Sequence, residues 1–289
     1  MSVASLPPGA RAWTLRPLEA ADVPLAQALT ASFGWPHRRR DWAMMLGLGE
    51  GVAASDGERL AGTAVCWRFG PDWATMGLIG VDAALQGQGI GRRMMEALMD
   101  GLGGRSLVLH ATRAGLPLYT ALGFEPTGTT LQYQGAVAQP GLLPLPAGLR
   151  LRPAGSADLS LLASLDRAAG AQDRSALLTV LLAQPGGVVL DGPDGPLGFA
   201  LTRGFGRGQL IGPVVAADEA GARAMIAHLL GQRIGQFARL DIPKDSALAP
   251  WLTTLGLEDA GTVIRMVRGK DAQPAAQARV FALASQAWG

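Results

Sequence analysis

A glycine-rich turn followed by two arginines is the stretch of this sequence whose residue types and spacing best suit chemistry. Within Leu78–Asp100 the residues Gln86-Gly87-Gln88-Gly89-Ile90-Gly91 precede Arg92 and Arg93. Glycines lack the Cβ atoms that keep a phosphate away from backbone N–H groups, and a helix N-terminus carries roughly half a positive charge. We therefore expect an anion site here.

Two well-known phosphate-binding motifs do not fit this turn. A dinucleotide fingerprint requires G-x-G-x-x-G near the start of a βαβ unit, with an acidic residue about 20 residues later. Here the glycines run G-x-G-x-G after a glutamine, about 85 residues into the chain. A Walker-type loop requires Gly-Lys-Ser or Gly-Lys-Thr, which does not follow. The pattern argues against NAD, FAD and Walker-type nucleotide binding.

The elements that must position this turn are a strand and a helix. Leu78–Val81 is an apolar run typical of a buried strand, and Ile90, Met94 and Leu98 recur at the spacing of one helix face. A second short motif, Leu118-Tyr119-Thr120-Ala121-Leu122-Gly123-Phe124, follows downstream.

These two motifs resemble those of the GCN5-related N-acetyltransferase (GNAT) superfamily. Gln86–Gly91 matches its Q/R-x-x-G-x-G/A signature, Val81-Asp82-Ala83 stands where the family usually has V-x-P, and Leu118–Phe124 is similar to its L-Y-x-x-x-G-F motif. The resemblance implies an acyl-CoA-dependent N-acyltransferase that moves an acetyl group from acetyl-CoA to a primary amine of a small molecule. Attack would be direct, in a ternary complex.

The resemblance also assigns roles to individual residues. The pyrophosphate would be held between Gln86 and Arg92, and backbone groups of the preceding strand would pair with the amides of the pantetheine arm. Tyr119 would donate a proton to the departing thiolate, against the alternative of a packed aromatic side chain. The implied cofactor-binding residues are Ile79, Val81, Gln86, Gly87, Gln88, Gly89, Ile90, Gly91 and Arg92.

No general base is evident. Many GNAT enzymes have a glutamate on or beside the strand before the loop, but Trp73–Gly80 contains no carboxylate. Asp72 and Asp82 flank this strand, and we interpret both as solvated turn residues. His110 follows Ser106–Leu109, which we expect to form a strand, and its ring is expected to be satisfied structurally rather than to act as a base. Two alternatives stay open: a water molecule takes the proton from the substrate amine, or the substrate amine has a lower pKa and does not require a base.

Composition narrows the class of protein. Residues 1–135 carry 11 Lys+Arg and 11 Asp+Glu, so this half is not a basic nucleic-acid module by charge. Cys66 is the only cysteine and the three histidines are scattered, so we expect neither a disulfide framework nor a metal site. No uncharged run that is apolar throughout approaches the roughly 20 residues of a membrane helix. We expect a cytoplasmic protein, monomeric or homodimeric, without nucleic-acid or membrane partners.

The sequence contains an internal repeat. Leu15-Arg16-Pro17 recurs as Leu151-Arg152-Pro153, and Leu78-Ile79-Gly80 recurs as Leu210-Ile211-Gly212. Apolar helices are expected at Val23–Leu29 and Leu159–Leu165 in equivalent places. We therefore predict an α/β (α+β) chain of tandem GNAT folds, each a mixed, mostly antiparallel twisted sheet flanked by helices. The predicted boundaries are 1–135 for the acetyl-CoA-binding domain, 136–147 for a linker and 148–289 for a degenerate second domain covering the substrate cleft.

The second copy departs from the first at the phosphate turn. Asp218 and Glu219 stand where the first copy has glycines, and two carboxylates would repel a pyrophosphate. The second half resembles the YitH/HolE-type acetyltransferase domain that follows an N-terminal GNAT domain in a group of bacterial proteins. Its charged residues Asp166, Arg167, Asp173 and Arg174 would form either an ion network or a substrate site.

Three further expectations remain open to test. Phe33–Trp42, with three arginines among aromatic residues, would form either a wall for an anionic acceptor or a helix start with solvated arginines; we favour the latter. The tail Gln273–Trp288 has helical periodicity. Alternative functions are an acetyl-CoA-binding regulatory or sensor protein without catalysis, and acetylation of protein N-termini or lysines.

Overall fold

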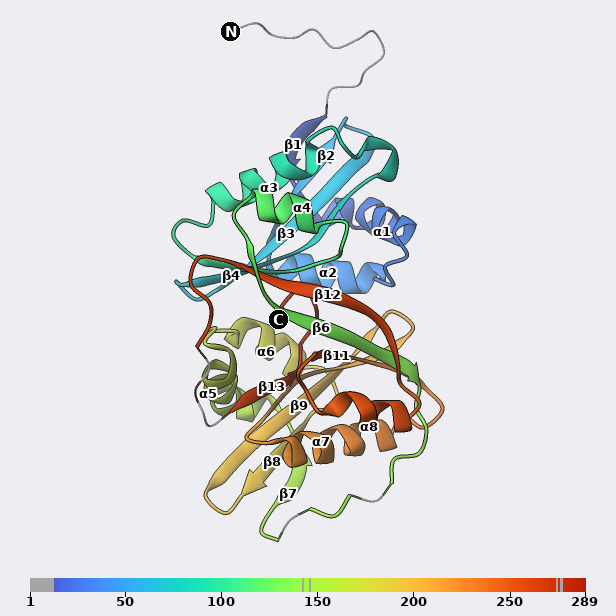
Figure 1. Ribbon diagram of the computed structural model, residues 1–289, viewed down its shortest axis with the longest axis vertical. Coiled ribbons are helices and arrows are strands. Elements are labelled where there is room, and N and C mark those ends of the chain that lie inside the picture. The colour runs from blue at the N-terminus through green and yellow to red at the C-terminus, as the bar shows by residue number, and fades with distance from the viewer. Residues whose placement is uncertain (1–12, 142, 146, 274, 276–277) are drawn as a thin grey trace, which may run out of the picture. The chain divides into compact units, whose positions relative to one another are not determined.

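The structure is a computed structural model that describes residues 13–289 except 142, 146, 274, 276 and 277 (Figure 1). Its described residues form two compact units: unit 1 comprises 13–67 and 77–103, and unit 2 comprises 68–76 and 104–289. Two of the three divisions fall within strands β3 (Leu60–Phe69) and β4 (Trp73–Val81), and each unit is described by itself. Unit 2 contains residues from both predicted domains, and the boundaries at 1–135, 136–147 and 148–289 stay predictions.

Unit 1 is a small sheet with helices. Antiparallel pairing joins β1 to β2 and β2 to β3. Its elements are β1 (Thr14–Pro17), α1 (Val23–Ser32), α2 (Arg39–Leu48), β2 (Glu50–Ser55), most of β3, the end of β4, and α3 (Ile90–Asp100). The predicted helix at Val23–Leu29 is confirmed as α1. Its core contains Trp42 and Met45 from α2, together with Met94 and Met95 from α3, all with at most trace exposure.

Unit 2 is a larger mixed sheet. Its strands run in the order β4-β5-β12-β6-β11-β10-β9-β8-β7, with β13 on β10. Its elements are the start of β4, β5 (Ser106–Ala111), α4 (Leu116–Ala121), β6 (Glu125–Ala136), β7 (Arg150–Pro153), α5 (Leu159–Gly170), α6 (Ser175–Leu182), β8 (Val188–Gly192), β9 (Gly195–Phe205), β10 (Gly208–Ala216), α7 (Glu219–Gly231), β11 (Phe237–Pro243), α8 (Leu248–Thr254), β12 (Glu258–Arg268) and β13 (Arg279–Ala282).

Most of the pairs in unit 2 are antiparallel. Parallel pairing is found between β4 and β5 and between β10 and β11, which are equivalent positions in the two sequence repeats. The predicted mixed, mostly antiparallel sheets flanked by helices are confirmed, and so is the predicted helix at Leu159–Leu165, which lies within α5. A hydrophobic core beneath α7 and α8 includes Met225, Leu229 and Leu252, none of them exposed.

The two sequence repeats exchange strands at the centre of unit 2. Strand β12, from the second repeat, lies between β5 and β6 of the first, and it pairs antiparallel with both. Strand β6 in turn pairs with β11 of the second repeat, from Phe237 opposite Ala136 to Pro243 opposite Thr130. Figure 1 shows β12, in red, beside β6, in green. Each repeat thus completes its sheet with a strand from the other.

The predicted helix over Gln273–Trp288 is wrong for the residues that the structure describes. Arg279–Ala282 forms β13, which pairs with β10, and the last residues form turns. Residues 274, 276 and 277 of this prediction lie outside the described part. The spacing of Val280, Leu283, Ala284 and Ala287 suits a helix face, but the unpaired edge of β10 offers backbone partners that the periodicity does not reveal. Among the described residues, no helix has the length and apolar character needed to cross a bilayer.

Candidate active site

The glycine turn forms the N-terminal end of α3 in unit 1. Gly87 and Gly89 have φ angles of 77° and 76°, in the left-handed region that favours glycine. Nothing lies within 4 Å of the position that a Cβ would take at either residue, so both face open space. Gln86, Gly87, Gln88 and Gly89 are exposed. At these two glycines the turn therefore presents backbone to solvent.

The first turn of α3 has no side-chain cap. Gly89 is the N-cap residue, and within the described part of the chain it provides no side-chain cap to the amides that follow. The N–H groups of Ile90, Gly91 and Arg92 have no acceptor within the helix, because the first N–H groups of any helix precede their partners. These donors, the helix dipole and the exposed Arg93 favour an anion, while Arg92, also exposed, lies 3.3 Å from Glu96 in a surface ion pair. The predicted pyrophosphate residues have the chemistry that an anion requires.

The helix is anchored by its apolar face. Ile90, Met94 and Leu98 are buried, which confirms the predicted helical spacing. The Met94 methyl lies so close to Gly62 of β3 that a Cβ there would come within 2.7 Å of it. Burial of these side chains stabilises the helix by roughly 1.5–3 kcal/mol each and fixes the direction of its N-terminus.

Strand β4 carries an irregularity beside the predicted pantetheine residues. Leu78 has a φ of 51°, an unusual value for a residue with a side chain, and its carbonyl accepts a hydrogen bond from Thr63 Oγ1 at 2.9 Å. Ile79 and Val81 follow it and are partly exposed. The left-handed residue interrupts the alternation of the strand, which changes the direction of the backbone groups at Ile79 and Val81.

The predicted aromatic wall has one member that packs on this strand. A Cβ at Gly80 would come within 2.4 Å of the Phe33 ring, and Phe33 meets Trp35 edge to face at 5.4 Å. Arg38 does not point its charge at a ligand, because it binds Asp41 with two hydrogen bonds of 2.7 and 2.8 Å at the start of α2. Trp42 is buried. The favoured interpretation is confirmed for the helix start, for the core side chain Trp42 and for Arg39 and Arg40, which are exposed. It is wrong for Arg38, which is paired with Asp41 rather than solvated.

Tyr119 lies on α4 in unit 2, almost fully buried beside Phe124, at 6.2 Å between ring centroids. Burial raises the pKa of its phenol to about 12. The side chain is therefore protonated across the physiological pH range and has a hydrogen to donate. It also packs closely over Gly115, where a Cβ would come within 2.7 Å of its ring.

The two carboxylates that flank β4 have ordinary surroundings. Asp82 Oδ1 accepts a hydrogen bond from the Ala84 amide at 2.9 Å and caps a short 3₁₀ turn, while Asp72 is exposed. Both observations agree with their interpretation as turn residues. Neither carboxylate is identified as a general base by these surroundings.

The equivalent helix of the second repeat, α7, begins differently. Asp218 is its N-cap, and its carboxylate accepts a hydrogen bond from the Gly221 amide at 2.8 Å. The chain's own carboxylate thus occupies the place that an anion takes at an uncapped helix. This supports the prediction that the second repeat has lost phosphate binding.

The charged residues predicted for the second half form two separate ion pairs in unit 2. Arg174 and Asp166 are both buried, with Arg174 Nε 2.8 Å from Asp166 Oδ2, whereas Arg167 and Asp173 form an exposed pair at 2.8 Å. Arg174 also donates to the carbonyl oxygens of Trp288 and Gly289. An ion network is therefore present, and it fastens the last residues of the chain to α5 and α6.

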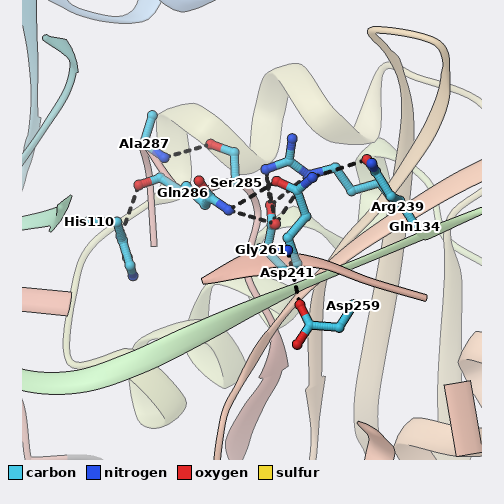
Figure 2. A network of polar contacts seen from close by, with 10 residues as sticks. His110, Gln134, Arg239, Asp241, Asp259, Gly261, Ser285, Gln286 and Ala287 are labelled. Carbon is cyan, nitrogen blue, oxygen red and sulfur yellow. Dashed lines mark hydrogen bonds and ion pairs between the residues drawn. The ribbon is translucent and has the colours of Figure 1, made fainter. Parts of the chain in front are cut away.

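His110 belongs to a polar network that sequence reasoning missed. Its Nδ1 lies 2.8 Å from the carbonyl oxygen of Gln286, and the Gln286 side-chain amide donates to Asp241 at 3.0 Å (Figure 2). Asp241 is buried and forms an ion pair with Arg239. The prediction that His110 is satisfied is wrong for its second ring nitrogen, because Nε2 is shielded from solvent and has no hydrogen-bond partner among the described residues.

The structure thus places the predicted cofactor residues Ile79, Val81 and Gln86–Arg92 together in unit 1, and Tyr119 in unit 2. Within the described part of the chain, no cluster of three or more His, Cys, Asp and Glu side chains has the arrangement of a metal site. His110 was missed because its partner Gln286 lies 176 residues away.

Comparison with known proteins agrees with this geometry. Residues 49–126 and residues 162–282 each match a family model described as an acetyltransferase (GNAT) domain. The chain is 31% identical over 219 residues to the uncharacterized N-acetyltransferase YitH of Bacillus subtilis, covering 74% of this chain and 76% of that protein.

Solved structures show the same fold at low identity. A structure from Pyrococcus horikoshii has a TM-score of 0.79 at 19% identity and covers 100% of this chain and 99% of its own. A tandem GNAT protein from the clavulanic acid biosynthesis pathway has a TM-score of 0.61 at 14% identity, with coverage of 91% and 100%.

Proposed function

The chain belongs to the GNAT family of N-acetyltransferases, and from this premise we propose that it acetylates a primary amine of a small molecule with acetyl-CoA as cosubstrate. The observation that carries the proposal is the uncapped N-terminus of α3 with its two left-handed glycines. The family implies an acyl-CoA cosubstrate, and the exposed amides and arginines of this turn suit the diphosphate of coenzyme A.

The residues would act as follows. Gln86–Arg92 bind the diphosphate through backbone N–H groups, and the arginines add positive charge. Backbone groups of Ile79 and Val81 pair with the amides of the pantetheine arm. The amine attacks the thioester carbonyl, a C–N bond forms, and the C–S bond breaks.

Tyr119 is proposed as the donor to the departing sulfur. Its raised pKa of about 12 keeps the proton available but makes the phenol a weaker acid than a thiol of pKa about 8.5. Complete transfer to a free thiolate would be uphill by about 5 kcal/mol. Donation therefore has to accompany cleavage of the C–S bond, while the sulfur still gains charge.

The test compares two substitutions of Gly89 that differ in the charge of the new side chain. Gly89→Asn and Gly89→Asp add side chains of nearly the same shape, and both residue types tolerate the left-handed backbone and cap helices well. We expect Gly89→Asp to weaken acetyl-CoA binding in calorimetry at least tenfold more than Gly89→Asn does. Equal affinities for the two variants would remove the proposed diphosphate site.

Activity is measured on the full chain as thiol released from acetyl-CoA over a panel of small primary amines and short peptides. Release with small amines supports the proposal. Release with peptides alone would point to protein acetylation, and tight acetyl-CoA binding with a silent panel would point to a sensor.

A further inference from the structure

Unit 2 contains a cavity of about 720 Å³ that is separate from the residues proposed for acetyl transfer. Its walls come from β5, β6, β12, the end of β11, the α5–α6 connection and the last residues of the chain. Neither Tyr119 nor any predicted cofactor residue is among the described residues that line it. A volume of this size suits a small molecule, which need not be a reactant of acetyl transfer.

Two buried polar side chains in the walls lack a hydrogen-bond partner. Gln172 is 8% exposed and Thr130 is 3% exposed, and both line the cavity. Neither the Gln172 amide nor the Thr130 hydroxyl has a partner among the described residues. Unlike Thr75 Oγ1 and His110 Nε2, which are unpaired and fully shielded, the polar atoms of Gln172 and Thr130 keep accessible surface. Buried polar groups without partners are costly, which favours a ligand that brings partners to them.

The backbone holds both side chains in place. Ala171, directly before Gln172, has a φ of 58°, an unusual value for a residue with a side chain, and its N–H donates to the Arg167 carbonyl oxygen at 2.7 Å. Thr130 lies on β6, which has β12 on one side and β11 on the other (Figure 1). Strained residues that the surrounding structure maintains occur frequently at ligand sites, so the α5–α6 connection agrees with such a role.

The charges that a ligand would meet in the cavity are predominantly positive. Three cations and two carboxylates line it, namely Arg174, Lys244, Arg265, Asp245 and Asp271. Asp166, which neutralises Arg174, is not among the lining residues. Burial, followed by the charge of Arg265, lowers the pKa of His110 on the same wall to about 4. The pairing of Arg265 with Asp271 at 2.7 Å therefore leaves a positive potential there.

Lys244 is the cation of this cavity that has no ion-pair partner among the described residues. Its backbone N–H donates to the Thr129 carbonyl oxygen at 2.9 Å, which fixes the start of the side chain beside Thr130 on β6. The residue is exposed, as is the neighbouring Asp245. Lys244 thus offers a charge-assisted hydrogen bond, and Thr130 offers a hydroxyl from a neighbouring place on the wall.

We propose that this cavity binds a small organic carboxylate, as a monoanion with an apolar body, at a site separate from acetyl transfer. Lys244 binds the carboxylate, and Gln172 and Thr130 form hydrogen bonds with the polar groups of the ligand. The apolar body contacts the apolar part of the wall, which includes Val108, Val280 and Leu283. No step of the proposed acetyl transfer uses these residues, so the site is independent of the proposed function.

The first experiment varies only the head group of the probe. Calorimetry on the full chain compares 3-phenylpropionate, 3-phenylpropanamide and 3-phenylpropylamine, and then the same three head groups on a hexyl chain. We expect the carboxylate of at least one series to bind about tenfold tighter than the amide, and the amine to bind most weakly. An amide or amine that binds as tightly as the carboxylate overturns the preference for a monoanion. Failure of all six compounds to bind overturns the site.

The second experiment locates the bound carboxylate. Lys244→Gln should weaken its binding about threefold and Lys244→Glu about tenfold, because the contribution of an exposed charge is modest. Gln172→Leu removes a buried hydrogen-bonding group and should weaken binding about tenfold. The matched control is Lys270→Gln, at the other lysine of the chain, which is exposed and outside the cavity lining. Unchanged affinity in Lys244→Glu overturns the site, and this variant at an exposed position does not depend on repacking the wall.

Competition distinguishes this cavity from the proposed diphosphate site at α3. We expect the carboxylate probe to bind equally well with and without saturating acetyl-CoA, and Lys244→Glu to keep the acetyl-CoA affinity of the wild type. Loss of probe binding in the presence of acetyl-CoA would place the carboxylate at the α3 turn and overturn the separate site. A protein that binds the probe but not acetyl-CoA would overturn the proposed function and leave the carboxylate site standing.

Discussion

The lowered pKa of His110 leads to a prediction about the stability of the folded protein. Its pKa in the folded protein is about 4, below the value of about 6.5 expected when unfolded. Between these values the unfolded chain binds the proton more tightly, so this group's contribution is fully present above pH 6.5 and is lost as pH falls toward 4. The loss is at most about 3 kcal/mol.

Thermal melting from pH 7 to 4.5 checks this prediction. The wild type should lose stability over that interval, and His110→Gln should lose markedly less, with His228→Gln following the wild type. Carboxylates with lowered pKa, such as Asp22 and Asp158, contribute mainly below about pH 4, so they interfere little. Parallel melting curves for the wild type and His110→Gln would contradict the buried, neutral imidazole.

Tyr119 supports a prediction about the chemical step. Tyr119→Phe removes the hydroxyl but keeps the ring that packs on Gly115 and Phe124. We expect kcat to fall about a hundredfold with KM for acetyl-CoA nearly unchanged, as removal of a proton donor does. Tyr133→Phe, at the other tyrosine in the core beneath α7, is the control. A kcat in Tyr119→Phe equal to that of the control would leave Tyr119 only its packing role.

At the scale of single elements, the two equivalent helices α3 and α7 differ in how their N-termini are satisfied. Asp218→Ala should destabilise the protein by about 1 kcal/mol, because α7 loses the carboxylate that accepts from Gly221. Asp218→Asn keeps an acceptor oxygen and should cost less. Neither should change acetyl-CoA affinity in calorimetry. A second binding event appearing in Asp218→Ala would show that this carboxylate alone excludes the ligand from the second repeat.

Local pattern was sufficient for the elements around the phosphate turn. The spacing of Ile90, Met94 and Leu98 was sufficient to predict the helix α3. The glycines at 87 and 89 permit the left-handed backbone that the turn adopts. The sequence could not reveal the partners of β6 or of His110, since strand pairing and the Gln286 contact join residues more than 100 positions apart. The same is true of Gln273–Trp288, because the helical periodicity of this segment did not indicate the strand β13.

For the whole molecule, the exchange of β12 and β6 makes the two sequence repeats depend on each other. Separating them in the linker leaves β5 and β6 without the strand between them, and exposes backbone N–H and C=O groups along both edges. It also deprives β11 of its partner β6. A repeat on its own would therefore lack part of its sheet, even though its own sequence motifs are intact.

We therefore expect that chains cut after residue 140 fold only together. Residues 1–140 and 141–289 produced separately should aggregate or melt without a cooperative transition, whereas the two produced together should co-purify and melt cooperatively, because β12 can then enter between β5 and β6. The uncut chain with a short glycine-serine insertion after residue 140 is the control, since it changes the linker and keeps both repeats joined. A cooperative melt of residues 1–140 alone as a monomer would contradict the exchange, because that fragment contains no residue of β12.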